Sequence, residues 1–149
     1  MDTQPLPGLS RCAKPRPPRR PPVLPAAVQL LQESTRGLAS AQALEAPHER
    51  YAAAHLAALR AAAAVLASRA QPLTRRRPMS VWALLPQVAP ELSEWAAFFA
   101  SGARKRAAAE AGLTRSVTAR DADDLVRSAQ TFRELVIDLL RYTSRSRAG

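Results

Sequence analysis

The sequence of 149 residues predicts an all-α protein, an antiparallel up-and-down helical bundle of four main helices plus one short helix. Apolar residues recur at spacings of three and four along several stretches, which is the period of an amphipathic helix. Prolines, glycines and capping residues divide these stretches where helices begin and end. The connections are short, which favours antiparallel packing of neighbouring helices. No stretch reads as a convincing β-strand.

The first two helices are expected at residues 26–43 and from Pro47 to about Ala70. Gly37 weakens the first helix, because glycine costs helix stability. Pro47 suits the first position of the second helix, and Glu49 lies in its opening turn, where the helix dipole favours an acidic residue. Each helix has its own apolar candidates for the core, in the first Val28, Leu31, Leu38 and Leu44, and in the second a stripe of Leu56, Leu59, Ala63 and Leu66.

A short helix follows the basic loop QPLTRRRP. Ser80 is its expected N-cap, with Met79 and Leu84 placed as a hydrophobic staple, and Pro86 stops or kinks it. The next helix is expected to open at Pro90 and to continue as one element to a C-terminal signal at Gly112. One of its faces carries Leu92, Trp95 and Phe99.

The last helix is expected at residues 119–144, with Thr118 as its N-cap. Three acidic residues in its first turn favour the positive end of the helix dipole, and two arginines lie near the negative end; these residues are Asp121, Asp123, Asp124, Arg141 and Arg145. A heptad-like seam alternates spacings of four and three through Leu125, Ala129, Phe132, Val136 and Leu139. A second apolar set indicates either deeper burial, which we favour, or a dimer contact, and consists of Val126, Leu135 and Leu140.

Two segments are expected, a disordered Pro/Arg-rich tail at residues 1–25 and one helical domain at residues 26–145. Cys12 is the single cysteine, so one chain can form neither a disulfide framework nor a cysteine-based metal site, as is typical of a reducing cytoplasm. The N-terminus lacks the apolar segment of a signal peptide. The most apolar stretch, residues 52–67, contains His55 and Arg60, which argues against a membrane span. Together these features predict a cytoplasmic protein.

The formal net charge is +10, from 20 Arg and 2 Lys against 12 acidic residues. This excess favours anionic partners such as nucleic acid, although arginine-rich and alanine-rich chains also arise from GC-rich genomes. Two basic clusters could contact a phosphate backbone, one in a loop and one on a helix; they are Arg75, Arg76, Arg77 and Arg104, Lys105, Arg106. The aromatic residues that could stack on bases are instead expected in the core, namely Trp82, Trp95, Phe98, Phe99 and Phe132.

Arg50 and His55 are the candidate catalytic pair. Histidine is suited to acid–base catalysis near neutral pH, and arginine can hold a phosphate by two hydrogen bonds. Five residues apart on one helix, the two side chains point about 140° away from each other. They could therefore converge only at a helix end or across a symmetric interface. The alternative is an ordinary histidine at the flank of the core, beside Tyr51.

No metal or cofactor site is predicted. The two histidines, His48 and His55, lack a positioned carboxylate or thiolate. The three aspartates at the start of the last helix are better explained by the helix dipole than by a cation. No glycine-rich phosphate loop is present in the sequence.

Three segments together resemble the HEPN family, in particular a small Ala-rich actinobacterial HEPN subfamily: RYAAAHLAALRAAAAVLASRA, SVWALLPQVAPELSEWAAFFASGARKRAAAEAG and TARDADDLVRSAQTFRELVIDLL. The resemblance covers residues 26–143 and lies in continuous similarity and helix order. It implies a bundle of four or five antiparallel helices that commonly dimerises. Many HEPN domains are metal-free ribonucleases, whose Arg-x4-6-His motif from both protomers builds one cleft; others lack the motif and bind nucleotides or partners.

The chain departs from the ribonuclease pattern, because that motif normally lies in or just before a late helix. The late helix here contains no histidine, and the one match, Arg50 to His55, lies in the second helix. Three functions therefore stay open. The first is a non-catalytic module, as a homodimer, for RNA, nucleotide or a protein partner. The second is a toxin-type ribonuclease that uses Arg50 and His55 across a dimer, and the third is a plain helical scaffold.

Overall fold

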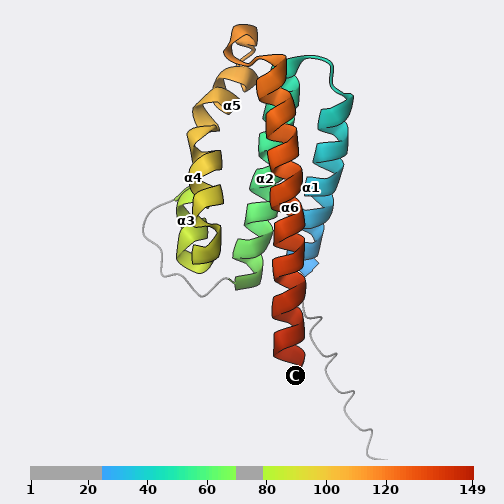
Figure 1. Cartoon of the computed structure of the whole chain (residues 1–149), viewed down its shortest axis with the longest axis vertical. Helices are drawn as coiled ribbons and strands as arrows, with labels where there is room; N and C mark the ends of the chain where they lie inside the picture. The colour runs from blue at the N-terminus through green and yellow to red at the C-terminus, as the bar shows by residue number, and fades with distance from the viewer. Residues whose placement is uncertain (1–24, 70–78) are drawn as a thin grey trace, which may run out of the picture.

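The computed structural model describes residues 25–69 and 79–149, and within these ranges it contains helices and connecting turns but no strand (Figure 1). The elements in order are α1 (Pro25–Ala43), α2 (Pro47–Arg69), α3 (Val81–Val88), the 3-10 turn η1 (Pro90–Leu92), α4 (Ser93–Ser101), α5 (Ala103–Glu110), the 3-10 turn η2 (Thr114–Ser116) and α6 (Ala119–Ala148). Residues 1–24 of the expected tail and the basic loop with Arg75, Arg76 and Arg77 lie outside the described residues, whereas Pro25, the last residue of that tail, begins α1.

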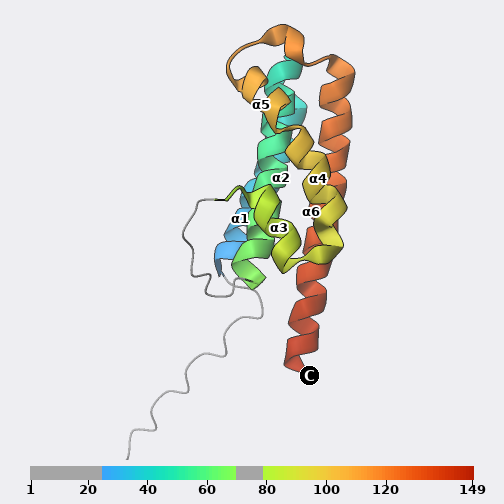
Figure 2. The same cartoon turned by 90° about the vertical axis from the view of Figure 1, so that its left-hand side faces the viewer.

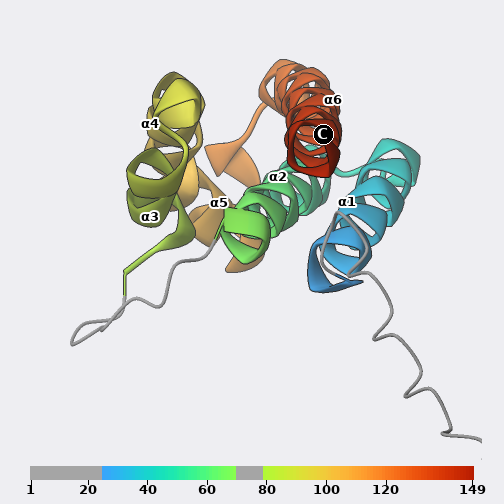
Figure 3. The same ribbon diagram turned by 90° about the horizontal axis from the view of Figure 1, so that it is seen from below.

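Helix α2 is the centre of the bundle. It packs against α1 and α6 along its length, and against α3 and α5 on its other side. Seen from below, α2 lies between α1 and the α3–α5 segment, with α6 lying over α1 and α2 (Figure 3). The long helices run nearly parallel to one axis, and α6 extends beyond the others at its C-terminal end (Figure 2). The prediction of an all-α helical bundle is confirmed.

The capping signals in the sequence mark real helix ends. The Ser80 hydroxyl accepts a hydrogen bond from the Ala83 amide at 3.2 Å at the start of α3. Thr118 and Asp121 form a reciprocal capping box at the start of α6, with both bonds at 3.0 Å. Gly112 ends α5 with a positive φ of 81°, a conformation that glycine adopts without strain. Pro86 does not stop α3, which continues to Val88.

The seam of α6 forms a large part of the core. Its first four members are buried and Leu139 is partly buried against the core. Of the second apolar set, Val126 and Leu140 are buried whereas Leu135 is 40% exposed. Deeper burial within one chain therefore accounts for two of those three residues.

The prediction that the apolar stripe of α2 forms its buried core face was wrong. Its four members are only partly buried. The buried residues of α2 are instead Tyr51, Ala54, His55, Ala57, Ala58, Ala61, Ala62, Ala64 and Val65. The reason is that α2 has neighbours on several sides, and small side chains let those helices approach closely. Leucine spacing alone did not identify the buried face.

The helix expected from Pro90 to Gly112 is divided into η1, α4 and α5, with a break at Gly102. Phe98, expected in the core, is 46% exposed. The other four aromatic side chains of the expected set pack together and join α3, α4 and α6: Trp82 stacks on Phe99 at 5.0 Å between ring centroids, and Trp95 lies 5.6 Å from Phe132.

Within the described residues, α2 is the one helix long and apolar enough to cross a membrane by length and composition. Half of its most apolar stretch is buried inside the bundle, where four other helices pack against it. This is the behaviour of the core helix of a globular domain.

Candidate functional site around His55 and Arg50

His55 is fully buried in the middle of the bundle. Its Nε2 lies 2.8 Å from the carbonyl oxygen of Phe99. A carbonyl can only accept, so Nε2 carries the proton and Nδ1 is the bare acceptor. Nδ1 is buried and has no hydrogen-bond partner in the described part of the chain. The ring is surrounded by Tyr51, Trp82 and Phe99, with centroid distances of 6.5, 5.8 and 5.9 Å.

These surroundings favour the neutral imidazole. Burial lowers the pKa of His55 from its ordinary value of 6.5, because the charged form would lose its hydration. The Phe99 carbonyl and Glu110 act in the opposite direction, and Arg106 adds to the lowering. A general acid or base must reach a substrate proton, and this imidazole faces only protein atoms within the chain.

Gly102 explains how the ring reaches the Phe99 carbonyl. Phe99 lies near the C-terminal end of α4, where its carbonyl accepts from the Gly102 amide at 3.1 Å as well as from His55. A Cβ at Gly102 would lie 2.8 Å from the Tyr51 hydroxyl and 3.5 Å from His55 Cδ2. The break between α4 and α5 therefore accommodates both rings. A glycine inside an expected helix was the sequence signal for it.

Arg50 is directed to a different part of the molecule. Its Nε donates to the Leu44 carbonyl at 3.0 Å and its Nη2 donates to the Glu45 carbonyl at 3.0 Å. Its Nη1 donates to Asp123 Oδ1 at 2.6 Å. The guanidinium thus ties the α1–α2 connection to the first turns of α6. Only 17% of the side chain is exposed, so this arginine has a structural position.

The structure does not bring Arg50 and His55 together within one chain. They share no partner: the histidine contacts α3 and α4, and the arginine contacts the α1–α2 connection and α6. Their convergence across a dimer stays a prediction, and it would require His55 to leave its buried position.

The basic cluster on α5 is largely paired with carboxylates. Lys105 Nζ lies 3.3 Å from Asp121 Oδ2 and also 6.0 Å from the centroid of the Tyr51 ring. Arg106 Nε lies 3.8 Å from Glu110 Oε1, one turn along the same helix. Arg104 is exposed and forms no ion pair with the described residues. One of these three cations is therefore available to an anionic partner.

A second group of cations lies at the C-terminal end of α6. Leu140 is the last buried residue of this helix, and the projecting turns beyond it carry exposed Arg141, Arg145 and Arg147. No acidic residue follows Asp138, and none of the three arginines forms an ion pair within the described ranges. Tyr142, between them, is 72% exposed. From the sequence, Arg141 and Arg145 were expected only to interact favourably with the helix dipole.

The acidic first turns of α6 are occupied by protein contacts. Asp121 caps the helix, and its pKa is lowered first by the Thr118 amide, then by the Thr118 hydroxyl and Lys105. Asp123 pairs with Arg50, and Asp124 pairs with Arg127. Across residues 25–69 and 79–149, no group of three or more His, Cys, Asp or Glu side chains is placed to hold a metal ion.

The model of the SAV_6107-like HEPN family matches residues 41–137, from the end of α1 to the last buried turns of α6. No curated protein and no solved structure matches the chain.

Proposed function

Since the chain belongs to the SAV_6107-like HEPN family, we propose that it is a member that binds RNA without cleaving it, through the basic C-terminal turns of α6. The observation that carries the proposal is the burial of His55. A histidine that is 0% exposed, with Nε2 engaged by a backbone carbonyl, has no access to a ribose hydroxyl or a leaving oxygen.

The contacts of Arg50 support the same proposal. A catalytic arginine must offer two donors to a phosphate, but this guanidinium already donates to two carbonyls and one carboxylate. Freeing it would leave those carbonyls without their donor. Both members of the sequence motif are thus better explained as parts of the bundle.

The C-terminal end of α6 supports the choice of RNA. Its three arginines are exposed, lie on a projecting helix and have no carboxylate partner among the described residues. Arginine binds phosphate oxygens in a two-pronged geometry, and an exposed tyrosine such as Tyr142 can stack on an unpaired base. The net charge of +10 adds a long-range attraction to a polyanion.

The cleavage test uses the purified full chain with labelled mixed-sequence RNA in EDTA at low salt. Wild type should leave the RNA intact, as should His55→Gln and the matched variant His48→Gln, which changes the other histidine of the chain. Metal-free cleavage by wild type that is lost in a folded His55→Gln variant but kept in His48→Gln would instead establish a ribonuclease.

The binding test compares two triple variants with equal loss of charge. Arg141→Ala/Arg145→Ala/Arg147→Ala removes the cations at the end of α6, and Arg36→Ala/Arg104→Ala/Arg115→Ala removes three exposed cations from other elements. The first set should weaken binding of single-stranded RNA far more. It should also reduce the magnitude of the slope of log K against the logarithm of the salt concentration by about 2. Equal weakening by both sets would contradict a defined RNA surface, and no salt-sensitive binding by wild type would remove the RNA proposal.

A further inference from the structure

An apolar surface is exposed on the side of the bundle where side chains of α4 meet side chains of α6. The Trp95 ring of α4 lies 5.6 Å from the Phe132 ring of α6, between centroids. Phe98 contacts Trp95 edge to face at 6.3 Å and is 46% exposed. Leu135 and Leu139 follow Phe132 on the same side of α6, the first exposed and the second partly buried. We call Trp95, Phe98, Leu135 and Leu139 the α4–α6 face.

Carboxylates without an ion-pair partner border the α4–α6 face. Glu94 precedes Trp95 on α4, and Glu134 and Asp138 lie on α6 beside the two leucines. All three are exposed, and none forms an ion pair within the described ranges. Because the chain as a whole is strongly basic, this is a local region of negative charge next to exposed aromatic and aliphatic side chains.

The N-terminal segment 14–22, KPRPPRRPP, has the complementary chemistry. It precedes α1, outside the described residues, and contains four cations, five prolines and no acidic residue. Proline fixes φ at about −65°, so such a sequence favours the polyproline II conformation and loses little entropy on binding. Proline-rich segments bind surfaces lined by aromatic rings, and carboxylates bind arginine through charge-assisted hydrogen bonds.

The place where α1 begins lets this segment reach the α4–α6 face. Pro25 begins α1 at the end of the bundle from which the last turns of α6 project (Figure 1, Figure 2). Seen from below, α6 lies between α1 and α4 (Figure 3). A path halfway around a helix of about 10–12 Å diameter is about 17 Å long, which about six residues of polyproline II cover. Residues 19–24 therefore suffice to bring Lys14 and Arg16 to the face.

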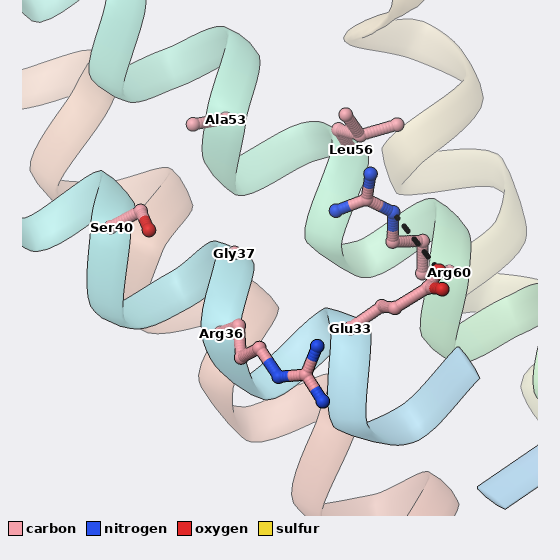
Figure 4. Close-up of a pocket in the computed structure, with 7 residues that line it drawn as sticks. All are labelled: Glu33, Arg36, Gly37, Ser40, Ala53, Leu56 and Arg60. Atoms are coloured by element: carbon pink, nitrogen blue, oxygen red, sulfur yellow. Dashed lines mark ion pairs between the residues drawn. The ribbon is translucent and has the colours of Figure 1, made fainter. Parts of the chain in front are cut away.

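The shallow groove of about 360 Å³ between α1 and α2 is a poorer site for this segment (Figure 4). Its rim carries the guanidinium groups of Arg36 and Arg60, which repel a basic segment. Glu33, the one carboxylate that lines the groove, already lies 3.8 Å from Arg60. No aromatic ring is among the lining residues, and the apolar ones are Gly37, Ala53 and Leu56.

We propose that residues 14–22 dock on the α4–α6 face of their own chain. The prolines pack against Trp95 and Phe98, and the cations that alternate with them pair with Glu94 and Asp138. Docking covers apolar surface that otherwise contacts water and supplies the missing partners of the carboxylates. Because the segment belongs to the same chain, its effective concentration at the face is high, which favours docking over binding to another molecule.

The test uses the full chain with a nitroxide spin label on Cys12, its single cysteine, two residues before the segment. Paramagnetic broadening of backbone amide signals in isotope-labelled protein shows which surface the label approaches. Amides of residues 95–98 and 135–139 should lose most of their intensity and regain it when the nitroxide is reduced. Amides of residues 36–40 and 53–56, at the groove between α1 and α2, should keep theirs.

One pair of variants tests the charges. Glu94→Gln/Asp138→Asn removes two carboxylates of the face and should abolish most of the broadening there. Glu45→Gln/Glu49→Gln is the matched control, because these two carboxylates are also exposed and without an ion pair in the described ranges, but lie at the start of α2. The control should retain the broadening of wild type.

A second pair tests the aromatic contact. Phe98→Ala leaves every charge in place and should reduce the broadening, whereas Leu113→Ala, which changes a 59% exposed side chain after α5, should not. Circular dichroism should give every variant the wild-type helix content, because all substituted side chains are exposed. Loss of broadening in the charge variant but not in Phe98→Ala would reduce the contact to general attraction between charges and contradict docking on this face.

Wild-type amides of the face that keep their intensity, or broadening spread evenly over the surface, would overturn the proposal. A mixed sample identifies whose segment docks: isotope-labelled Cys12→Ser chain is combined with spin-labelled chain that carries no isotope. The face should then show no broadening, and broadening in this mixture would assign the segment to another copy instead. No RNA is present in any sample, so the outcome is independent of the proposed function.

Discussion

The imidazole Nε2 of His55 in α2 lies 2.8 Å from the carbonyl oxygen of Phe99, three residues before the break between α4 and α5. A buried side chain of the central helix thus supplies a hydrogen bond to a carbonyl at the end of α4. The same ring is the histidine of the Arg-x4-His motif. The motif histidine is therefore part of the core of the bundle. The pH dependence of protein stability tests its protonation state.

The first prediction concerns pH. The pKa of His55 is lower in the folded chain than its ordinary value of 6.5, so between these two values the unfolded chain binds the extra proton and the folded chain does not. The free energy of unfolding should therefore fall as the pH falls below about 6.5, by at most about 1.4 kcal/mol per pH unit, until the pH reaches the folded pKa. Urea unfolding between pH 7.5 and 5.5 measures this slope.

His55→Gln should remove this pH dependence, because glutamine does not titrate. His48→Gln should retain it. The range stays above pH 5.5 because the carboxyl groups of Glu91 and Asp121, whose pKa values are lowered, titrate only in more acidic solution. An unchanged slope in His55→Gln would show that another group is responsible.

The second prediction concerns Gly102. Its φ of −80° and ψ of −8° suit any residue, and alanine would normally stabilise a helical position by about 1 kcal/mol. Here the added Cβ would lie 2.8 Å from the Tyr51 hydroxyl, and Tyr51 is buried and cannot move aside freely. Gly102→Ala should therefore destabilise the protein by about 1–3 kcal/mol in urea unfolding.

Two further variants show whether the Tyr51 hydroxyl causes that loss. Tyr51→Phe removes the clashing atom, so it should recover part of the stability when combined with Gly102→Ala. Gly37→Ala, whose Cβ makes an ordinary contact at 3.4 Å, should be neutral or stabilising. If Gly102→Ala stabilised as much as Gly37→Ala, the close packing of Tyr51 against the break would be refuted.

The third prediction concerns Arg50. Arg50→Ala removes the donor to the carbonyls of Leu44 and Glu45, and we expect a loss of about 2 kcal/mol in the free energy of unfolding. Asp123→Ala removes only the ion pair, whose carboxylate side chain is 55% exposed, and should cost less than about 1 kcal/mol. Arg50→Lys should restore little, because an ammonium cannot reproduce the planar set of donors. Equal losses for Arg50→Ala and Asp123→Ala would assign the effect to charge alone.

The fourth prediction concerns Ser34, a buried polar residue of α1. Its hydroxyl donates to the Ala57 carbonyl of α2 at 2.7 Å. Ser34→Ala should lower the free energy of unfolding by about 1 kcal/mol. Thr35→Ala is the matched control, since that exposed hydroxyl bonds only to Leu31 of its own helix. Thermal unfolding of the two variants compares them, and equal melting temperatures would mean that the interhelical bond adds no stability.

Much of the helical pattern was predictable because its causes are local. Ser80, Gly112 and Thr118 end or begin helices through contacts within a few residues, and the seam of α6 follows from its own spacing. The break at Gly102 had a visible signal, but it depends on Tyr51 and His55, about 50 residues away in sequence. Phe98 and Phe99 are neighbours in the sequence, and only packing made one exposed and the other buried.

By itself, the sequence determined the helical class, most helix boundaries and the family resemblance, since capping, propensity and periodicity act over one or two turns. Tertiary structure alone decided which face of the alanine-rich α2 is buried. Its many alanines make the faces of the helix similar in hydrophobicity, so the positions of the neighbouring helices determine which residues are covered. It also decided which elements the two side chains of the Arg-x4-His motif contact. Arg50 and His55 are five residues apart in sequence, yet one turns to α6 and the other to α4, because a helix rotates its side chains by about 100° per residue.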